Sequence, residues 1–144
     1  MLVLDCSGNF IDRDISENAF DGAEGAAQDR FYDAYGSKIC CLVVILSCEG
    51  EPVGFCSYFH WITRSLDGDW FTLNYKIDYV YIMKEFRGMG FSNKIYPVVV
   101  DGIYQGCNKA RVEEVFDASE YIDFGGIVFG EKIRRGLMGL GSWN

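Results

Sequence analysis

The first quarter of the chain has the hydrophobic pattern of helices. Alanines and aromatic residues recur at helical spacing from Asp14 onward. Asp14 and Glu17 have the spacing of a capping box, which marks the start of a helix. Gly22 and Gly25 interrupt the pattern, and Gly36 follows its last apolar position. We therefore predict two helices, separated near the two internal glycines and ended by Gly36.

The middle of the chain has the pattern of β-strands. Residues 39–47 form a continuous apolar, β-branched run, which is typical of a strand covered on both faces. Turn residues then lead into a hairpin partner at 53–62 and a third strand at 70–83, in which apolar and polar positions alternate. We predict an antiparallel meander of three strands, with residues 2–4 as an additional short edge strand.

The last part of the chain alternates between helix and strand. A helix is expected to end at Gly106, with Pro97 kinking it or delaying its start. A strand at 111–116, a helix at 119–134 and a short strand in the tail follow. The order of elements predicts an α+β fold, and the length of 144 residues predicts a single domain over residues 1–144.

Composition and charge narrow the kinds of protein that the chain can be. Lys and Arg number 13 against 21 Asp and Glu, a net charge of −8, which repels phosphate polymers and disfavours binding to nucleic acid. The apolar runs are shorter than the ~20 residues needed to cross a bilayer, and the N-terminus lacks the basic and apolar regions of a signal peptide. We therefore expect a cytoplasmic protein with no membrane partner.

The cysteines and the histidine give little support to a metal site or a disulfide. The six cysteines are Cys6, Cys40, Cys41, Cys48, Cys56 and Cys107. They contain no Cys-x-x-Cys pair, and the single histidine, His60, disfavours an ordinary zinc site. We interpret His60 as a hydrogen-bonded strand residue rather than a catalytic base, and the cysteines as reduced core residues. No metal is predicted.

The strongest candidate for chemistry is the loop that joins the third meander strand to the next helix. Gly88 and Gly90 can adopt positive φ and leave no Cβ in the way of an incoming anion. Successive backbone N–H groups at the start of the helix, together with the Arg87 side chain, form a binding site suited to a diphosphate. A tight turn with no ligand explains the glycines equally well when the loop is considered alone.

The pattern Arg-x-x-Gly-x-Gly/Ala, present here as residues 87–92 with Ser92 in the last position, resembles the acyl-CoA loop of the GNAT N-acetyltransferase superfamily. The resemblance implies a GNAT-like acyl-CoA N-acyltransferase fold, with a mixed, mainly antiparallel sheet flanked by helices. It also implies acetyl-CoA as co-substrate, with the backbone before the loop holding the pantetheine arm. The implied coenzyme-binding residues are Ile82, Met83, Arg87, Gly88, Met89, Gly90, Phe91 and Ser92.

A weaker resemblance to the same superfamily lies at residues 123–133. Asp123 stands where the family often has an asparagine that contacts pantetheine, which makes it an implied coenzyme contact. Gly130 stands where the family often has the tyrosine that protonates the leaving thiolate. Tyr121 is the nearest tyrosine that could replace this acid, and Tyr96 and Tyr104 are alternatives. Packing is the more common role of such tyrosines and is the alternative for all three.

Acetyl transfer to an amine requires a group that removes a proton, because an amine with a pKa of about 10.4 is almost wholly protonated at pH 7. Asp78, on the strand that leads to the loop, is the candidate base, and partial burial is expected to raise its pKa. A carboxylate bound to backbone at a strand bulge is the alternative. Glu113 and Glu114 are further candidates, and a backbone N–H near Met83 is expected to bind the oxyanion.

These observations predict an N-acetyltransferase that moves an acetyl group from acetyl-CoA to a primary amine in a ternary complex. The acidic net charge, with Asp67 and Asp69 in one turn, favours a cationic acceptor. The alternative is a degenerate GNAT domain that binds coenzyme A or a protein partner without catalysis, which the departures at Asp123 and Gly130 favour. A homodimer is also left open, because a second subunit can complete the acceptor wall.

Overall fold

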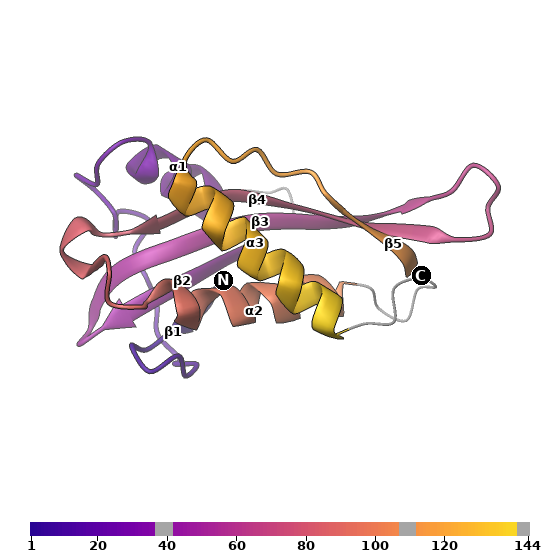
Figure 1. Ribbon diagram of the computed structural model, residues 1–144. Helices are drawn as coiled ribbons and strands as arrows, with labels where there is room; N and C mark the ends of the chain where they lie inside the picture. The colour runs from indigo at the N-terminus through magenta and orange to yellow at the C-terminus, as the bar shows by residue number, and fades with distance from the viewer. Residues whose placement is uncertain (37–41, 107–111, 141–144) are drawn as a thin grey trace. The chain divides into compact units, whose positions relative to one another are not determined.

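The computed structural model describes residues 1–36, 42–106 and 112–140, and Figure 1 labels its elements. Five strands form one sheet in the order β1-β2-β3-β4-β5. The strands are β1 (Leu2–Leu4), β2 (Leu42–Cys48), β3 (Glu51–Arg64), β4 (Phe71–Ile82) and β5 (Val112–Asp117). The helices are α1 (Ala27–Tyr35), α2 (Ser92–Gln105), α3 (Phe124–Leu140) and the short 3₁₀ helix η1 (Lys84–Phe86).

The sheet is mixed. β1 pairs with β2 in parallel, with Leu4 opposite Leu46, and β4 pairs with β5 in parallel. β2 and β3 form an antiparallel hairpin whose turn contains Glu49 and Gly50, both at positive φ, as such a tight turn requires. The three central strands follow one another in the sheet as they do in the sequence. The predicted α+β fold with a mixed sheet is confirmed.

The chain forms two compact units, and both β3 and β4 contribute residues to each. The first unit comprises Met1–Tyr58 and Tyr79–Ile95, and the second comprises Phe59–Asp78 and Tyr96–Asn144. Each unit has its own buried side chains. A single domain over the whole chain stays a prediction.

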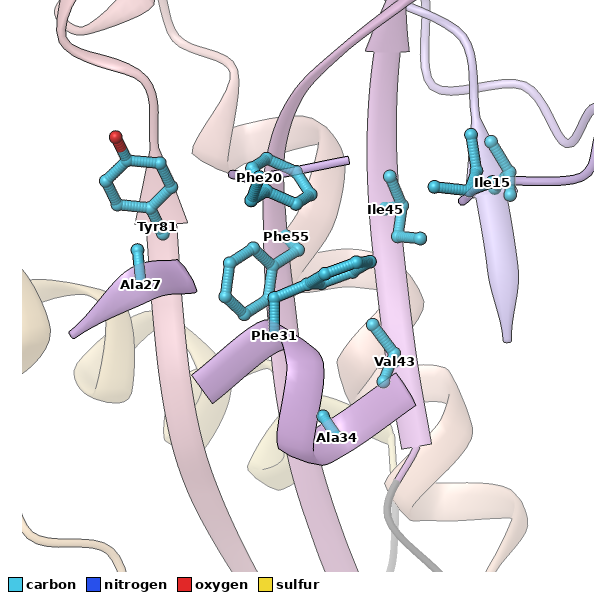
Figure 2. Close-up of a cluster of buried hydrophobic side chains, with 10 residues drawn as sticks. Ile15, Phe20, Ala27, Phe31, Ala34, Val43, Ile45, Phe55 and Tyr81 are labelled. Atoms are coloured by element: carbon cyan, nitrogen blue, oxygen red, sulfur yellow. The ribbon is translucent and has the colours of Figure 1, made fainter. Parts of the chain in front are cut away.

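The core of the first unit is an aromatic cluster under α1 (Figure 2). Phe31 on α1 lies 4.7 Å from Phe20 and 5.1 Å from Phe55 on β3, measured between ring centroids. Phe31 and Phe55 are fully buried, so each contributes roughly 1.5–3 kcal/mol through its removal from water. Tyr81, at the end of β4, closes the cluster beside Phe20.

The core of the second unit lies along α3. Phe129, Ile133 and Leu137 are buried and recur every four residues, so they form one stripe of the helix. Gly136 belongs to the same helix, and a Cβ at this position would lie 2.8 Å from the Val100 side chain on α2. The glycine therefore allows α3 and α2 to pack closely.

The two edge strands are protected in different ways. On the β1 side, Leu4 forms an isolated antiparallel bridge with Phe10, and the Ile11 N–H donates to the Val3 carbonyl at 3.0 Å. The β5 edge strand carries the carboxylates Glu113 and Glu114. The short edge strand predicted at residues 2–4 is confirmed.

The prediction of a helix between Asp14 and Gly25 is wrong, because this segment consists of turns. Its backbone bonds are isolated contacts to the third residue before, such as the one from the Ala23 N–H to the Phe20 carbonyl. Gly22 and Gly25 have φ of +77° and +62°, which a right-handed helix does not allow. Only the second predicted helix forms, as α1, and Gly36 ends it as expected.

The boundaries of the later helices also differ from the prediction. α2 begins at Ser92, so Pro97 does not delay its start; Pro97 lies inside the helix, where it has no N–H for the usual backbone hydrogen bond. α3 begins at Phe124 rather than at residue 119 and continues to Leu140, so the short strand predicted for the tail is wrong over its described residues. Residues 39–41, 111 and 141–144 lie outside the described residues.

Candidate functional site

The loop that links β4 to α2 has a fixed starting point. The Met83 N–H donates to the Val53 carbonyl at 2.8 Å, which pairs the end of β4 with β3. η1 follows, with the Phe86 N–H donating to the Met83 carbonyl and the Arg87 N–H to the Lys84 carbonyl. The backbone is therefore ordered by hydrogen bonds up to the first residue of the glycine motif.

The glycine motif has the backbone conformation expected of an anion-binding loop. Gly88 and Gly90 both have φ of +77°, a conformation that side chains with a Cβ strongly disfavour. α2 then begins at Ser92, and the first amides of a helix have no acceptor within it. Met89 is 62% exposed, and nothing lies within 4 Å of the position that a Cβ on Gly88 would occupy. This geometry leaves room for an anion beside the loop.

Arg87 is held by three neighbours in the first unit. Its Nε donates to the Ile82 carbonyl at 2.8 Å, and its Nη2 forms an ion pair with the Glu24 Oε1 at 2.5 Å. Its guanidinium carbon lies 5.7 Å from the centroid of the Tyr81 ring, a cation–π contact. The Arg87 side chain is nevertheless 49% exposed, so part of the guanidinium faces solvent.

Gly54 on β3 sets the position of Ile82. A Cβ at Gly54 would lie 2.6 Å from both the Ile82 Cδ1 and the Tyr81 carbonyl oxygen. The absence of a side chain therefore allows β3 to approach the end of β4, where the loop begins.

The predicted oxyanion donor is already in use. The single hydrogen of the Met83 N–H is donated to Val53 within the sheet. An oxyanion could bind it only if that strand pairing opened. The Met83 N–H is therefore not available to the oxyanion that was predicted to bind a backbone N–H near this residue, because the pairing with β3 continues to Met83.

A second group of candidate residues lies in the second unit, at the end of β5. The Asp117 carboxylate accepts hydrogen bonds from the Ser119 N–H and from the Tyr121 hydroxyl, both at 2.9 Å. The Ser119 hydroxyl accepts from the Ile77 N–H at 2.8 Å. Burial, followed by the nearby Asp117 carboxylate, raises the pKa of Tyr75, which stays protonated at neutral pH. Asp117 therefore organises the chain between β5 and α3.

Tyr121, the predicted acid, lies directly over Gly130. A Cβ at Gly130 would lie 2.3 Å from the Tyr121 Cζ and 2.5 Å from its hydroxyl oxygen. The Tyr121 ring thus occupies the space from which a side chain at residue 130 would project. Gly130, one of the departures from the GNAT pattern, is therefore sterically linked to Tyr121.

Asp123, the implied pantetheine contact, caps α3. Its Oδ1 accepts a hydrogen bond of 2.6 Å from the Gly126 N–H, and its carbonyl accepts the first full helical bond, from Ile127. Such a cap is favoured because it satisfies an N–H that has no partner within the helix. The cap also explains why α3 begins at Phe124 and not at residue 119.

The remaining candidates are placed as follows. Asp78 is partly buried on β4, in the second unit. Glu114 is exposed and Glu113 is partly buried, as the alternation along β5 predicted. His60 packs against Gly106 at the end of α2, since a Cβ there would lie 2.5 Å from the His60 Nδ1. Burial lowers the pKa of His60.

Cysteines and acidic residues form no metal cluster in the part of the chain that the structure describes. Cys48 and Cys56 are buried and form no disulfide within the described residues, whereas Cys6 is exposed, contrary to its predicted place in the core. Cys6 follows β1 in an exposed turn whose amides donate to the Asp5 carboxylate. Cys40, Cys41 and Cys107 lie outside the described residues. None of the described helices is long and apolar enough to span a membrane.

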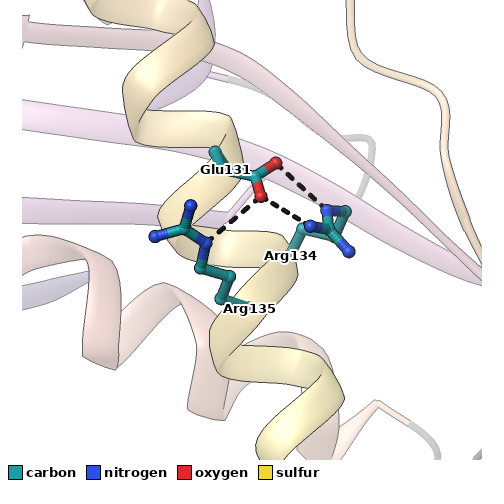
Figure 3. Close-up of polar contacts among 3 residues, drawn as sticks. All are labelled: Glu131, Arg134 and Arg135. Carbon is teal, nitrogen blue, oxygen red and sulfur yellow. Dashed lines mark hydrogen bonds and ion pairs between the residues drawn. The ribbon is translucent and has the colours of Figure 1, made fainter.

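An ion-pair cluster on α3 is a local feature of the helix surface (Figure 3). Glu131 binds Arg134 through two hydrogen bonds and Arg135 through one. Hydrogen bonding from Arg134 lowers the pKa of Glu131. All three groups are largely exposed, so the cluster supports the helix and lends itself to control substitutions.

Comparisons with known proteins relate this mixed sheet, with its glycine loop between β4 and α2, to acetyltransferases. No model of a protein family matches the chain. The chain is 30% identical over 99 residues to the thialysine N-epsilon-acetyltransferase of Bos taurus and 28% identical over 99 residues to that of Sus scrofa. The matched region is 68% of this chain but 54% of each relative, so the chain spans about half the length of these relatives.

Two solved structures share the fold. Both contain a tyrosine-to-phenylalanine variant of the toxin AtaT bound to the C-terminus of the antitoxin AtaR, the second also with acetyl-CoA. The TM-scores are 0.59 and 0.56 at 14% identity, and the alignments cover 85% of this chain and 77% and 78% of the other. The chain therefore has the GNAT fold, which confirms the predicted resemblance to that superfamily.

Two residues that organise the candidate sites, Glu24 and Asp117, are absent from the candidates that the sequence indicates. Glu24 pairs with Arg87 across 63 positions of sequence, a separation for which no local pattern exists. Asp117 follows the strand predicted at residues 111–116, and an aspartate whose side chain accepts from the N–H two residues later, as from Ser119 here, is typical of a turn.

Proposed function

We propose that the protein is an N-acetyltransferase that transfers an acetyl group from acetyl-CoA to a primary amine by direct attack in a ternary complex. The observation that carries the proposal is the loop at residues 87–92, whose positive-φ glycines lead into the start of α2 in a GNAT fold. Sequence similarity to an N-acetyltransferase supports the same reaction class.

The loop residues are proposed to hold the coenzyme by its diphosphate. The N–H groups of Gly88, Met89, Gly90, Phe91 and Ser92 supply donors, since amides at a helix start favour anions. Arg87 supplies a charged donor. The backbone of Ile82 and Met83 is proposed to bind the pantetheine arm, with Asp123 as an additional contact through the carboxylate oxygen that does not cap α3.

Bound acetyl-CoA supplies the acyl group as a thioester, and the protein must manage two protons. We assign removal of the amine proton to Asp78, whose partial burial on β4 suits a base. We assign protonation of the leaving thiolate to Tyr121. Its hydroxyl proton is donated to Asp117 in this structure, so the acid role requires that bond to be exchanged for one to the thiolate.

The acceptor is proposed to be a cationic amine. The net charge of −8 attracts amines and raises their concentration near the protein. The relatives are named for thialysine, which makes thialysine the first acceptor to test, beside polyamines, aminoglycosides and lysine peptides.

Thermal unfolding with and without acetyl-CoA tests coenzyme binding. Ligand at a hundred times its dissociation constant is expected to stabilise the protein by about 2.7 kcal/mol. The double variant Arg87→Glu, Gly90→Val should show no shift, whereas the control Arg135→Glu, which alters an arginine 74% exposed on α3, should shift like the natural chain. A natural chain indifferent to acetyl-CoA would contradict the proposal.

Binding without catalysis is the second candidate, and the absence of a tyrosine at residue 130 favours it. Release of free thiol from acetyl-CoA in the presence of the amine panel separates the two functions. A thermal shift without thiol release for any acceptor would support the binding function. If thiol release occurs, Asp78→Asn should slow it, and a full rate in that variant would reject Asp78 as the base.

A further inference from the structure

The Arg87 guanidinium has protein partners before any ligand binds, because two of its five N–H groups are already hydrogen-bonded. Nε holds the Ile82 carbonyl and Nη2 holds Glu24, while the guanidinium rests on the Tyr81 ring. A guanidinium has five N–H donors, so three remain for a diphosphate. The side chain is therefore fixed before any ligand arrives.

We propose that Glu24 is a positioning residue for coenzyme binding, which acts by holding the Arg87 guanidinium against the end of β4. The inference rests on the proposed function, since it assigns a role toward the same diphosphate loop. Glu24 lies far from the loop in the sequence and is not part of the motif at residues 87–92.

Glu24 is itself well anchored. It lies just before α1, where the Ala27 N–H donates to its carbonyl and the Gly22 N–H donates to the Gln28 side chain. Ala27 is fully buried in the aromatic cluster of the first unit. The ion pair therefore links the loop to a residue whose backbone is hydrogen-bonded to the start of α1.

The sign of the effect makes the proposal testable. A carboxylate beside a diphosphate site repels the ligand, so charge alone predicts that removing Glu24 strengthens coenzyme binding. Positioning predicts the opposite, because a loosened arginine must be ordered again when the ligand binds. The two effects act on the same measured dissociation constant in opposite directions.

The experiment compares Glu24→Ala with Glu85→Ala by calorimetric titration of acetyl-CoA. Glu85 is an exposed carboxylate in η1, close to the loop in sequence, and serves as the matched charge control. We expect Glu24→Ala to weaken acetyl-CoA binding by about two- to tenfold and Glu85→Ala to leave the affinity equal or slightly higher. In an Arg87→Ala background, Glu24→Ala should have no further effect on the affinity. Equal or tighter binding in Glu24→Ala, or equal weakening in both single variants, would overturn the proposal.

A readout without ligand separates this proposal from the proposed function. The Phe86 and Arg87 N–H groups are hydrogen-bonded within the loop, and their hydrogen exchange should become faster in Glu24→Ala but not in Glu85→Ala. If the natural chain fails to bind acetyl-CoA, the proposed function falls, and the exchange rates still decide whether Glu24 orders the loop. Unchanged exchange in Glu24→Ala would refute the positioning role by itself.

Discussion

Gly130→Ala is the substitution whose outcome depends most directly on the packing of the second unit. On an exposed helix this change is stabilising by about 1 kcal/mol, because alanine has the better helix propensity. Here the added methyl group would lie 2.3 Å from the Tyr121 Cζ and 2.7 Å from its Cε1. The ring must therefore move away from α3.

The cost follows from what the Tyr121 ring does. Forcing extra volume into a packed site costs about 1–3 kcal/mol. Moving the hydroxyl also gives up its bond to the Asp117 carboxylate, and hydrogen bonds to charged groups contribute about 1.5–3 kcal/mol. The propensity gain of about 1 kcal/mol offsets part of this, so the free energy of unfolding is expected to fall by about 1.5–5 kcal/mol.

Urea denaturation followed by circular dichroism measures the change, with Gly139→Ala as control. Gly139 lies on the same helix with nothing within 4 Å of its Cβ position, so that variant should be equally or more stable than the natural chain. In a Tyr121→Ala background, Gly130→Ala should also cease to destabilise. A Gly130→Ala protein as stable as the natural chain would refute the steric argument.

Three other predictions follow from single contacts. Gly54→Ala should lower the free energy of unfolding by about 1–3 kcal/mol in urea, because its Cβ would meet the Tyr81 carbonyl at 2.6 Å; an unchanged midpoint would contradict this. Burial lowers the pKa of His60, so the unfolded chain binds the imidazole proton at a higher pH than the folded chain does. The free energy of unfolding should therefore decline as the pH falls below about 6.5, and the decline should be less steep in His60→Gln. Identical pH profiles of the two proteins would reject the reasoning. Burial, with a hydrogen bond to Cys6, raises the pKa of Cys48 to about 11. Iodoacetamide at pH 8 should therefore modify the exposed Cys6 before Cys48, as measured by peptide mapping. Equal modification rates at the two thiols would contradict this prediction.

The strands were predictable from the sequence, whereas the turns that replace the expected helix before α1 were not. The continuous apolar run that became β2 and the alternation in β4 reflect burial directly, so pattern alone located them. The segment before α1 has a helical pattern as well, yet Gly22 and Gly25 adopt positive φ there. Whether an internal glycine is tolerated in a helix or breaks it depends on packing, as the unbroken helix across Gly130 demonstrates.

The loop at residues 87–92 could be selected from the sequence as a candidate site because its glycines and arginine lie in consecutive positions. Its glycines have the predicted backbone conformation, although coenzyme binding itself stays a prediction. The surroundings could not be identified in this way. The pairing of Glu24 with Arg87, and of Gly130 with the Tyr121 ring, joins residues that the fold brings together. A sequence motif can therefore identify a residue without identifying the distant residues that contact it in the fold.

The carboxylates of β5 limit how copies of this chain can associate. An open strand edge invites addition of a strand from another molecule, and like charges directly opposite each other oppose it. Antiparallel addition of a second β5 would bring Glu113 and Glu114 of each copy near those of the other. Within the part of the chain that the structure describes, these paired carboxylates therefore disfavour the antiparallel addition of one β5 to another.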